Sequence, residues 1–383
     1  MSIAAVLFWS SLGGVVYSYL GYPMILTVLA FFVKRSKSDR ALNVLPKVTL
    51  IVSVFNEEQV IEEKILNSLA LDYPRDLLEI VFLSDGSTDR TDDIISGYAQ
   101  QGVRLHRYEG RIGKTACLNQ AVPLVGGEII VFSDANSRYD QGAIRALVGR
   151  FSDDCIGFVT GRTRYLSPEG KKVRESVGVY ARIESEIKRL ESTIGSCVGA
   201  DGAIFAIRKG LYRPLQRTDI NDLVIPLRIV AQGFLGKLEE NAFCFEETAK
   251  EGVQEFHRQV RITNRTIRAL FNHAFLLNPI QYGSFAFQLF SHKVSRLLVP
   301  FFLLTLAATN LMLILEGPVY LLAGFTQAFF YLMAMGREGR GPNPIAWLMA
   351  LARTFTMVNL AILYAWLKYV KGETYVTWMP AQR

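Results

Sequence analysis

The chain has 383 residues, of which 50% are hydrophobic and only 20% are charged, and its mean hydropathy is +0.21. Soluble domains carry about 25% charged residues, so this composition excludes an ordinary soluble protein and a disordered one. The 42 basic and 35 acidic residues also exclude a chain made only of membrane helices, so we expect one water-exposed domain combined with membrane spans.

The first predicted element is an N-terminal membrane span, residues 1–33. Ser2–Val33 contains no Asp, Glu, Lys, Arg or His, and about 20 apolar residues are enough to cross a bilayer. A basic cluster, Lys34, Arg35 and Lys37, follows this run, whereas the basic region of a cleaved signal peptide precedes its apolar core. The positive-inside rule then places the residues after the span in the cytoplasm.

Residues 46–262 alternate strand-like and helix-like segments, which predicts an α/β domain with a largely parallel sheet. The expected strands are Val48–Phe55, Leu78–Leu83, Val103–Tyr108 and Glu128–Phe132. Three strands end in polar motifs, namely Asn56-Glu57-Glu58, the D-G-S-T-D run from Asp85 to Asp89, and Ser133-Asp134-Ala135-Asn136. Ligands bind at the carboxyl ends of such strands, so we interpret these motifs as one site rather than as three helix caps.

Two of the loops carry side chains suited to a metal ion and to a phosphate group. Asp134 and Asn136 are two residues apart and offer a carboxylate and an amide oxygen, which suit a hard cation such as Mg²⁺ or Mn²⁺. Lys114 follows Gly113 in a basic loop that does not match the Walker pattern. A lysine in such a loop before a helix can meet a phosphate, although a solvated loop gives the same pattern.

Two later segments are each open to two interpretations. Asp222, in the run Asp219-Ile220-Asn221-Asp222 before a helical segment, is either a helix cap or a general base. Arg258 and Arg261 are three residues apart and share one helical face. They are suited to a diphosphate or to anionic lipid headgroups.

The C-terminal third is expected to lie on and in the membrane. Residues 263–296 mix phenylalanines with His273, His292 and Lys293, which indicates amphipathic helices at the interface. Residues 297–370 contain about three further spans, near Leu297–Leu315, Gly317–Gly336 and Pro344–Leu367. Counting alternate crossings of the membrane from a cytoplasmic domain places the C-terminus outside. Lys368, Lys371 and Arg383 instead favour the inside, so the sequence does not decide on which side of the membrane the C-terminus lies.

The ordered set of motifs resembles the membrane-embedded family 2 inverting glycosyltransferases, the group that contains cellulose, chitin, hyaluronan and poly-N-acetylglucosamine synthases. The resemblance covers nearly the whole chain and implies a GT-A-like nucleotide-sugar-binding domain with transmembrane helices. It rests on the motifs N-E-E at Asn56, D-G-S-T-D at Asp85 and G-K-x-x-x-L-N from Gly113 to Asn119, followed by the D-x-D equivalent at Asp134 and Gly161-Arg162. The glycine-rich loop Val198–Ala203 and Asn221-Asp222 complete the series.

The resemblance implies a role for each matched residue. Asp222 is implied as the catalytic base; Asn56, Glu57, Asp85, Lys114, Asp134, Arg162, Arg258 and Arg261 as nucleotide-sugar-binding; Gly199, Asp201 and Gly202 as acceptor-binding; and Asp134 with Asn136 as metal-binding. Three positions depart from the family pattern. Asn136 replaces the second carboxylate of D-x-D, and Arg258 replaces the glutamine of the closing Q-x-x-R-W motif. Ile262 replaces the tryptophan of that motif, which lies beside the acceptor sugar in polymerising relatives. A processive synthase is therefore less expected.

The resulting expectation is a multi-pass enzyme of the plasma (inner) membrane with a cytoplasmic catalytic domain. It would transfer a hexose or N-acetylhexosamine from a UDP-sugar to a saccharide or lipid-linked acceptor, with Mg²⁺ or Mn²⁺ as cofactor, in surface or exported polysaccharide synthesis. A polyprenyl-phosphate glycosyltransferase and a non-catalytic export subunit are the alternatives. The net charge of +7 is attributed to cytoplasmic loops rather than to nucleic-acid binding.

Overall fold

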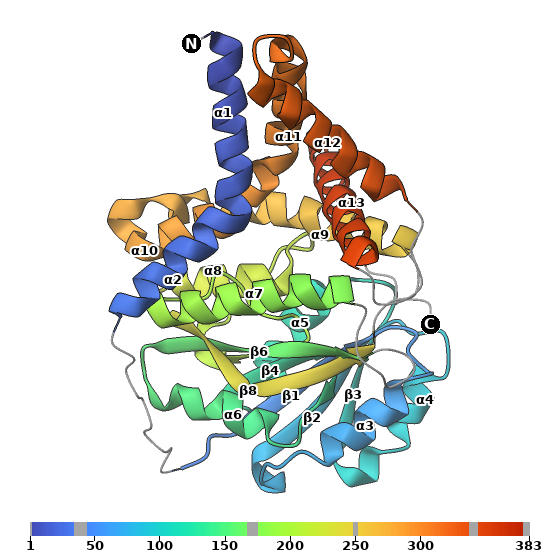
Figure 1. The fold of residues 1–383 in the computed structure, drawn as a ribbon. Helices are drawn as coiled ribbons and strands as arrows, with labels where there is room; N and C mark the ends of the chain where they lie inside the picture. The colour runs from blue at the N-terminus through green and yellow to red at the C-terminus, as the bar shows by residue number, and fades with distance from the viewer. Residues whose placement is uncertain (1, 34–43, 167–174, 248–251, 337–343, 378–383) are drawn as a thin grey trace.

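The computed structural model describes residues 2–33, 44–166, 175–247, 252–336 and 344–377. It contains a helix-flanked β-sheet and, on one side of it, a group of apolar helices (Figure 1). The basic clusters at Lys34–Lys37 and at Arg337 and Arg340, and Arg383, lie outside the described residues.

One eight-stranded mixed sheet forms the centre of the domain, in the order β3-β2-β1-β4-β7-β6-β8-β5. The strands are β1 (Val48–Val54), β2 (Leu78–Asp85), β3 (Val103–Tyr108), β4 (Ile129–Asp134), β5 (Arg138–Tyr139), β6 (Ile156–Leu166), β7 (Ile204–Arg208) and β8 (Leu235–Glu247). The first four predicted strands are parallel neighbours, so the predicted α/β fold is confirmed. Strand β7, which was not predicted, runs antiparallel between β4 and β6.

Helices cover both faces of the sheet, which explains why β1 reads as a continuous apolar run. They are α3 (Ile61–Leu69), α4 (Thr91–Ser96), α5 (Lys114–Leu124), α6 (Ala143–Gly149), α7 (Glu175–Ile194), α8 (Asn221–Ala231) and α9 (Gly252–Asn272). Leu50 and Val52 belong to the core shared with α3, α4 and α6. Ile51, between them, points into the opposite core, which includes α5, α8 and α9.

Among the residues that the structure describes, four helical stretches are long and apolar enough to cross a membrane: Ile3–Phe32, Pro279–Leu313, Pro318–Met335 and Pro344–Val370. They comprise α1 (Ile3–Val16) and α2 (Tyr22–Phe32), joined by a π-helical turn, then α10 (Pro279–Leu289), α11 (Ser295–Leu313), α12 (Pro318–Met335) and α13 (Pro344–Val370). Large apolar side chains such as Phe31, Leu315 and Phe325 are exposed on or beside them. So extensive an apolar surface is typical of contact with lipid.

The packing of these helices indicates on which side the chain ends. Ala5 and Phe8, at the start of α1, pack with Leu313 at the end of α11, far from the sheet (Figure 1). The end of α13 instead returns to the domain, where Trp366 Nε1 donates to the Leu297 carbonyl at 3.0 Å. Helices α12 and α13 together therefore bring the chain back to the domain once, and the last described residues lie on the domain side.

A buried ionic cluster joins the membrane helices to the domain. His292 is fully buried and lies between two carboxylates of α7, with Nδ1 2.7 Å from Glu191 Oε1 and Nε2 2.8 Å from Glu184 Oε1. The hydroxyl of Tyr22 on α2 donates to the same Glu191 oxygen at 2.6 Å, and Arg296 donates to Glu184 at 2.7 Å. Because these groups neutralise one another away from water, removal of one partner leaves buried charge unpaired.

We therefore expect Glu191→Ala to lower the free energy of unfolding by about 3 kcal/mol or more, since it removes the buried carboxylate that contacts His292 Nδ1 and the Tyr22 hydroxyl. The measurement is the thermal unfolding midpoint of the purified protein in detergent. The matched control is Glu186→Ala, whose partner Arg189 lies on the same helix at its exposed surface, for which about 0.5 kcal/mol is expected. Equal midpoints for the two variants would contradict the prediction.

Candidate active site

The loops that follow β1 and β2 are hydrogen-bonded to each other. Asn56 has a positive φ of 51° and exchanges hydrogen bonds with Thr88, accepting from its backbone N–H at 2.8 Å and donating to its hydroxyl at 3.1 Å. The backbone N–H of Glu57 donates to the Thr91 hydroxyl at 2.8 Å. The predicted nucleotide-binding residues Asn56 and Glu57 thus lie beside the D-G-S-T-D loop, and their described contacts hold the two loops together.

Asp85 ends β2 and is completely buried. Its carboxylate accepts from the backbone N–H of Gly113 at 3.0 and 3.2 Å and lies 3.4 Å from Arg111 Nε. The Arg111 guanidinium in turn stacks 3.3 Å from the centre of the Phe55 ring. Asp85 therefore fixes the loop before Lys114, and its predicted contact with the nucleoside stays a prediction.

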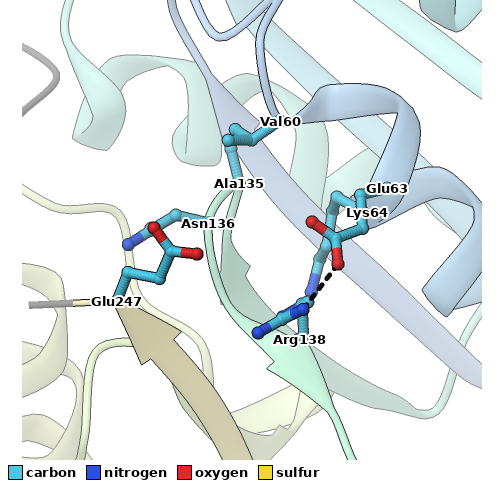
Figure 2. Close-up of a pocket in the computed structure, with 7 residues that line it drawn as sticks. All are labelled: Val60, Glu63, Lys64, Ala135, Asn136, Arg138 and Glu247. Atoms are coloured by element: carbon cyan, nitrogen blue, oxygen red, sulfur yellow. Dashed lines mark hydrogen bonds and ion pairs between the residues drawn. The ribbon is translucent and has the colours of Figure 1, made fainter. Parts of the chain in front are cut away.

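The predicted metal-binding residues occupy the turn after β4. Lys114 Nζ donates to Asp134 Oδ1 at 2.6 Å, and the Asp134 side chain remains 40% exposed. Figure 2 shows the side chains of Asn136 and Glu247, from the end of β8, turned toward each other. Glu247 thus supplies a carboxylate beside the amide at position 136.

This donor set fits a divalent cation held in an open site. Asp134 and Asn136 offer hard oxygen ligands, and Mg²⁺ or Mn²⁺ takes further ligands from substrate phosphates. Burial, the charge of Asp134 and that of Asp201 raise the pKa of Glu246, next to Glu247, to about 7. The described residues hold no group of three or more His, Cys, Asp or Glu that closes around an ion. A bound cation would reduce the excess of negative charge around Glu246 and Asp134.

Asp222 lies in the first turn of α8, opposite the glycine-rich loop. A Cβ added at Gly202 would lie 2.9 Å from Asp222 Oδ2, and the backbone N–H of Ala200 donates to the Asp222 carbonyl at 2.8 Å. The other carboxylate oxygen, Oδ1, is shielded from water and has no hydrogen-bond partner within the described residues. Burial raises the pKa of Asp222; Asp134 and Asp201 act in the same direction, while Lys114 and Lys188 oppose it.

Asp201 holds the predicted acceptor loop in shape. Its Oδ2 accepts from the backbone N–H and the hydroxyl of Thr163 at 3.0 and 2.9 Å, and its Oδ1 accepts from the backbone N–H of Ala203 at 3.2 Å. Gly199 lies beside the Asp222 backbone, where an added Cβ would be 3.5 Å from the carbonyl oxygen. The structure thus brings Gly199, Asp201 and Gly202 together with Asp222.

The predicted arginines are placed differently from one another. Arg162, on β6, pairs with Glu240. Arg258, which is 53% exposed, pairs with Glu255 at 3.1 Å, and its charge also acts on Glu246. Arg261 follows one turn later on α9 and is half-buried. The structure therefore brings Arg258 to the acidic groups, whereas the described contacts of Arg162 are made elsewhere.

Two contributions to this region were not predicted. Arg265 on α9 donates to the carbonyls of Thr218, at 3.1 Å, and Asp219, so it holds the loop that leads into Asp222. The C-terminal tail crosses to the loop before Lys114, where the Val376 carbonyl would lie 3.0 Å from a Cβ at Gly113. Arg265 could have been found from the sequence, because it belongs to the basic run Arg258–Arg265. No sequence pattern indicates the contact that the tail makes.

These side chains lie in an α/β domain, in the polar loops that follow the strands of its sheet. Residues 49–214 match the family model described as Glycosyl transferase family 2. Residues 49–214 therefore form a family 2 glycosyltransferase domain, and membrane-capable helices lie on both sides of it.

Known proteins agree with this assignment. The chain is similar to the poly-beta-1,6-N-acetyl-D-glucosamine synthase of Staphylococcus aureus, at 25% identity over 55% of this chain and 52% of that protein. It is also similar to the probable glycosyltransferase YdaM of Bacillus subtilis, at 32% identity over 32% of this chain and 31% of that protein. The match to the synthase thus spans about half of that protein's length.

A solved structure shares the fold. The mannosyltransferase PcManGT of Pyrobaculum calidifontis, solved with GDP-Man and Mn²⁺, superposes with a TM-score of 0.72 at 21% identity. The superposition covers 95% of this chain and 99% of that one. The predicted GT-A-like fold with membrane helices is confirmed by this match together with the family model.

The glycine at position 202 gives a direct test of the geometry around Asp222. Gly202→Ala places a methyl group 2.9 Å from Asp222 Oδ2, so the carboxylate must move, and we expect kcat to fall about 10-fold to 100-fold. Gly210→Ala is the matched control, because a Cβ there meets nothing within 4 Å. The measurement is release of nucleoside diphosphate; unchanged kcat in Gly202→Ala would remove Asp222 from the reacting centre.

Proposed function

We propose that this protein is a multi-pass inner-membrane glycosyltransferase that inverts the anomeric configuration of the sugar it transfers. The donor is a UDP-sugar, and the acceptor is a saccharide or lipid-linked glycan of surface or exported polysaccharide synthesis. Residues 46–262 form the cytoplasmic catalytic domain, 263–296 the interface helices, and 1–33 with 297–370 the membrane part. The similarity to the staphylococcal synthase supports the substrate class.

The observation that carries this proposal is the environment of Asp222. A general base needs a carboxylate with a raised pKa and an oxygen available to a substrate hydroxyl. Asp222 Oδ1 has no partner within the described residues, and its pKa is raised by burial. Its charge interacts with those of Lys114 and Asp134, the groups assigned to the donor phosphates.

In the proposed reaction the acceptor hydroxyl attacks the anomeric carbon in line with the departing diphosphate. Asp222 takes the proton of that hydroxyl as the new C–O bond forms and the bond to the diphosphate oxygen breaks. Lys114, released from Asp134 when donor binds, and Arg258 with Arg261 stabilise the negative charge of the leaving group. Asp134 and Asn136 would hold the cation, which supplies further charge stabilisation to the diphosphate when bound.

A lipid phosphate is the second candidate acceptor, and the position of Lys188 favours it. Lys188 lies on α7; burial lowers its pKa, but the negative charges of Asp201, Glu184 and Asp222 outweigh this effect, so the pKa is raised overall. An ammonium group beside the base and near the membrane helices is suited to an acceptor phosphate. Mass measurement of the product distinguishes a lipid-phosphate sugar from an extended glycan.

The principal test is Asp222→Asn in the purified full chain, assayed with UDP-sugars and GDP-mannose in the presence of Mn²⁺. We expect sugar transfer to fall by a factor of about 10³ or more while nucleotide binding is kept, because only the proton acceptor is lost. Asp154→Asn, at a fully exposed position just before the start of β6, is the control. Full activity in Asp222→Asn would refute the assignment of the base.

The pH dependence gives an independent check. Asp222 must be deprotonated to act, and burial raises its pKa. We therefore expect kcat/KM to decline, as pH falls, at a higher pH than the ordinary aspartate pKa of about 4 would give. A pH–rate profile measured at saturating metal tests this expectation; activity that stays level down to pH 4 would contradict it.

A further inference from the structure

Lys64 is a buried cation that neither the sequence motifs nor the proposed reaction uses. It lies on α3 and is 1% exposed. Its Nζ donates to the Ser133 hydroxyl at 2.7 Å and to the Ser137 carbonyl at 2.5 Å, and lies 4.3 Å from the centre of the Tyr139 ring. These two acceptors are the first and last residues of the turn that carries Asp134 and Asn136.

The ammonium group therefore ties both ends of the turn to one point. Figure 2 shows Lys64 reaching from its helix to the side of the turn that carries Ala135 and Asn136. Ser137 continues the connection, because its hydroxyl donates to Glu246 on β8. One side chain of α3 thus fixes the turn, and through Ser137 the turn is joined to β8.

This arrangement is energetically expensive, which argues that the charge has a use. Burial of an ammonium group without a contacting carboxylate disfavours its charged form. Burial lowers the pKa of Lys64 to about 8, although the negative charges of Asp134 and Glu246 oppose that shift. A helix that needed only to pack on the sheet would be served by an apolar side chain at lower cost, as Ile61 and Ile65 do on either side.

We propose that Lys64 is a positioning residue that holds the Ser133–Ser137 turn in the shape in which Asp134 and Asn136 bind the cation and the donor diphosphate. The inference rests on the proposed function. It assigns no chemical step to Lys64, which acts only through the turn. Ligand geometry sets the affinity of a metal site, so loss of this support should weaken metal and donor binding more than turnover.

The test compares Lys64→Met, which keeps most of the length of the unbranched side chain but removes the charge and the donors, with Ser68→Ala. Ser68 lies on the same helix, is equally buried, and donates only to the Lys64 carbonyl at 2.7 Å. Binding of Mn²⁺ with UDP is measured by electron paramagnetic resonance of free Mn²⁺, and KM for the donor and kcat are measured separately. Thermal unfolding midpoints of both variants record any loss of stability.

We expect Lys64→Met to weaken Mn²⁺–UDP binding at least 10-fold and to raise KM more than it lowers kcat, whereas Ser68→Ala changes stability alone. Ser133→Ala, which removes one of the two anchors, is the milder variant should Lys64→Met fail to fold, with an expected weakening of about 3-fold. Binding within 2-fold of the unaltered protein, in Lys64→Met or in Ser133→Ala if only that variant folds, would overturn the inference. Absence of Mn²⁺ and nucleotide binding in the unaltered protein would instead refute the proposed function.

Discussion

The accumulation of negative charge at the carboxyl edge of the sheet is the constraint on which the site depends. The charges of Asp134 and Asp201 act on both Asp222 and Glu246. Like charges so placed raise one another's pKa unless cations compensate. Lys114, Lys188, Arg258 and Lys64 are distributed around them and supply that compensation. At Asp222 and Glu246, burial reinforced by these like charges outweighs the compensation, so the pKa values of both carboxyl groups are raised.

The parts of this arrangement that are local in sequence could be predicted. Apolar runs with polar ends indicate parallel strands, and Lys114 and Asp134, taken from two separate motifs, do meet at 2.6 Å. Asp85 was matched correctly to its strand end, but the local pattern carried no information that Gly113 and Arg111 would enclose its carboxylate. The burial of Lys64 could not be predicted from the sequence for a related reason. In the run Ile61–Leu69 a lysine next to two glutamates has the pattern of a solvated helix surface, and only the packing of α3 under the turn reverses that interpretation.

Long-range pairing accounts for the rest. Strand β7 inserts between β4 and β6 although it comes after both in the sequence, and no local pattern specifies that neighbour. The side of the C-terminus was open for the same reason, because counting apolar segments treats each as one crossing. Helix α12 buries none of its residues, and α12 with α13 makes a single return to the domain. Of the two sequence arguments, the one from Lys368 and Lys371 agrees with this packing.

Helix α9 links the membrane part to both halves of the site. Through Arg265 it holds the carbonyls of Thr218 and Asp219, just before the proposed base. Through Asn264 it contacts the Ala365 carbonyl of α13 at 3.5 Å, and Arg268 donates to the Glu373 carbonyl at 2.7 Å, in the tail that reaches Gly113. A shift of α13 would therefore move the support of the base and the wall of the donor loop together. This shared support gives a physical reason for the enzyme domain and its membrane helices to fold as one unit, since a simple anchor would need none of these contacts.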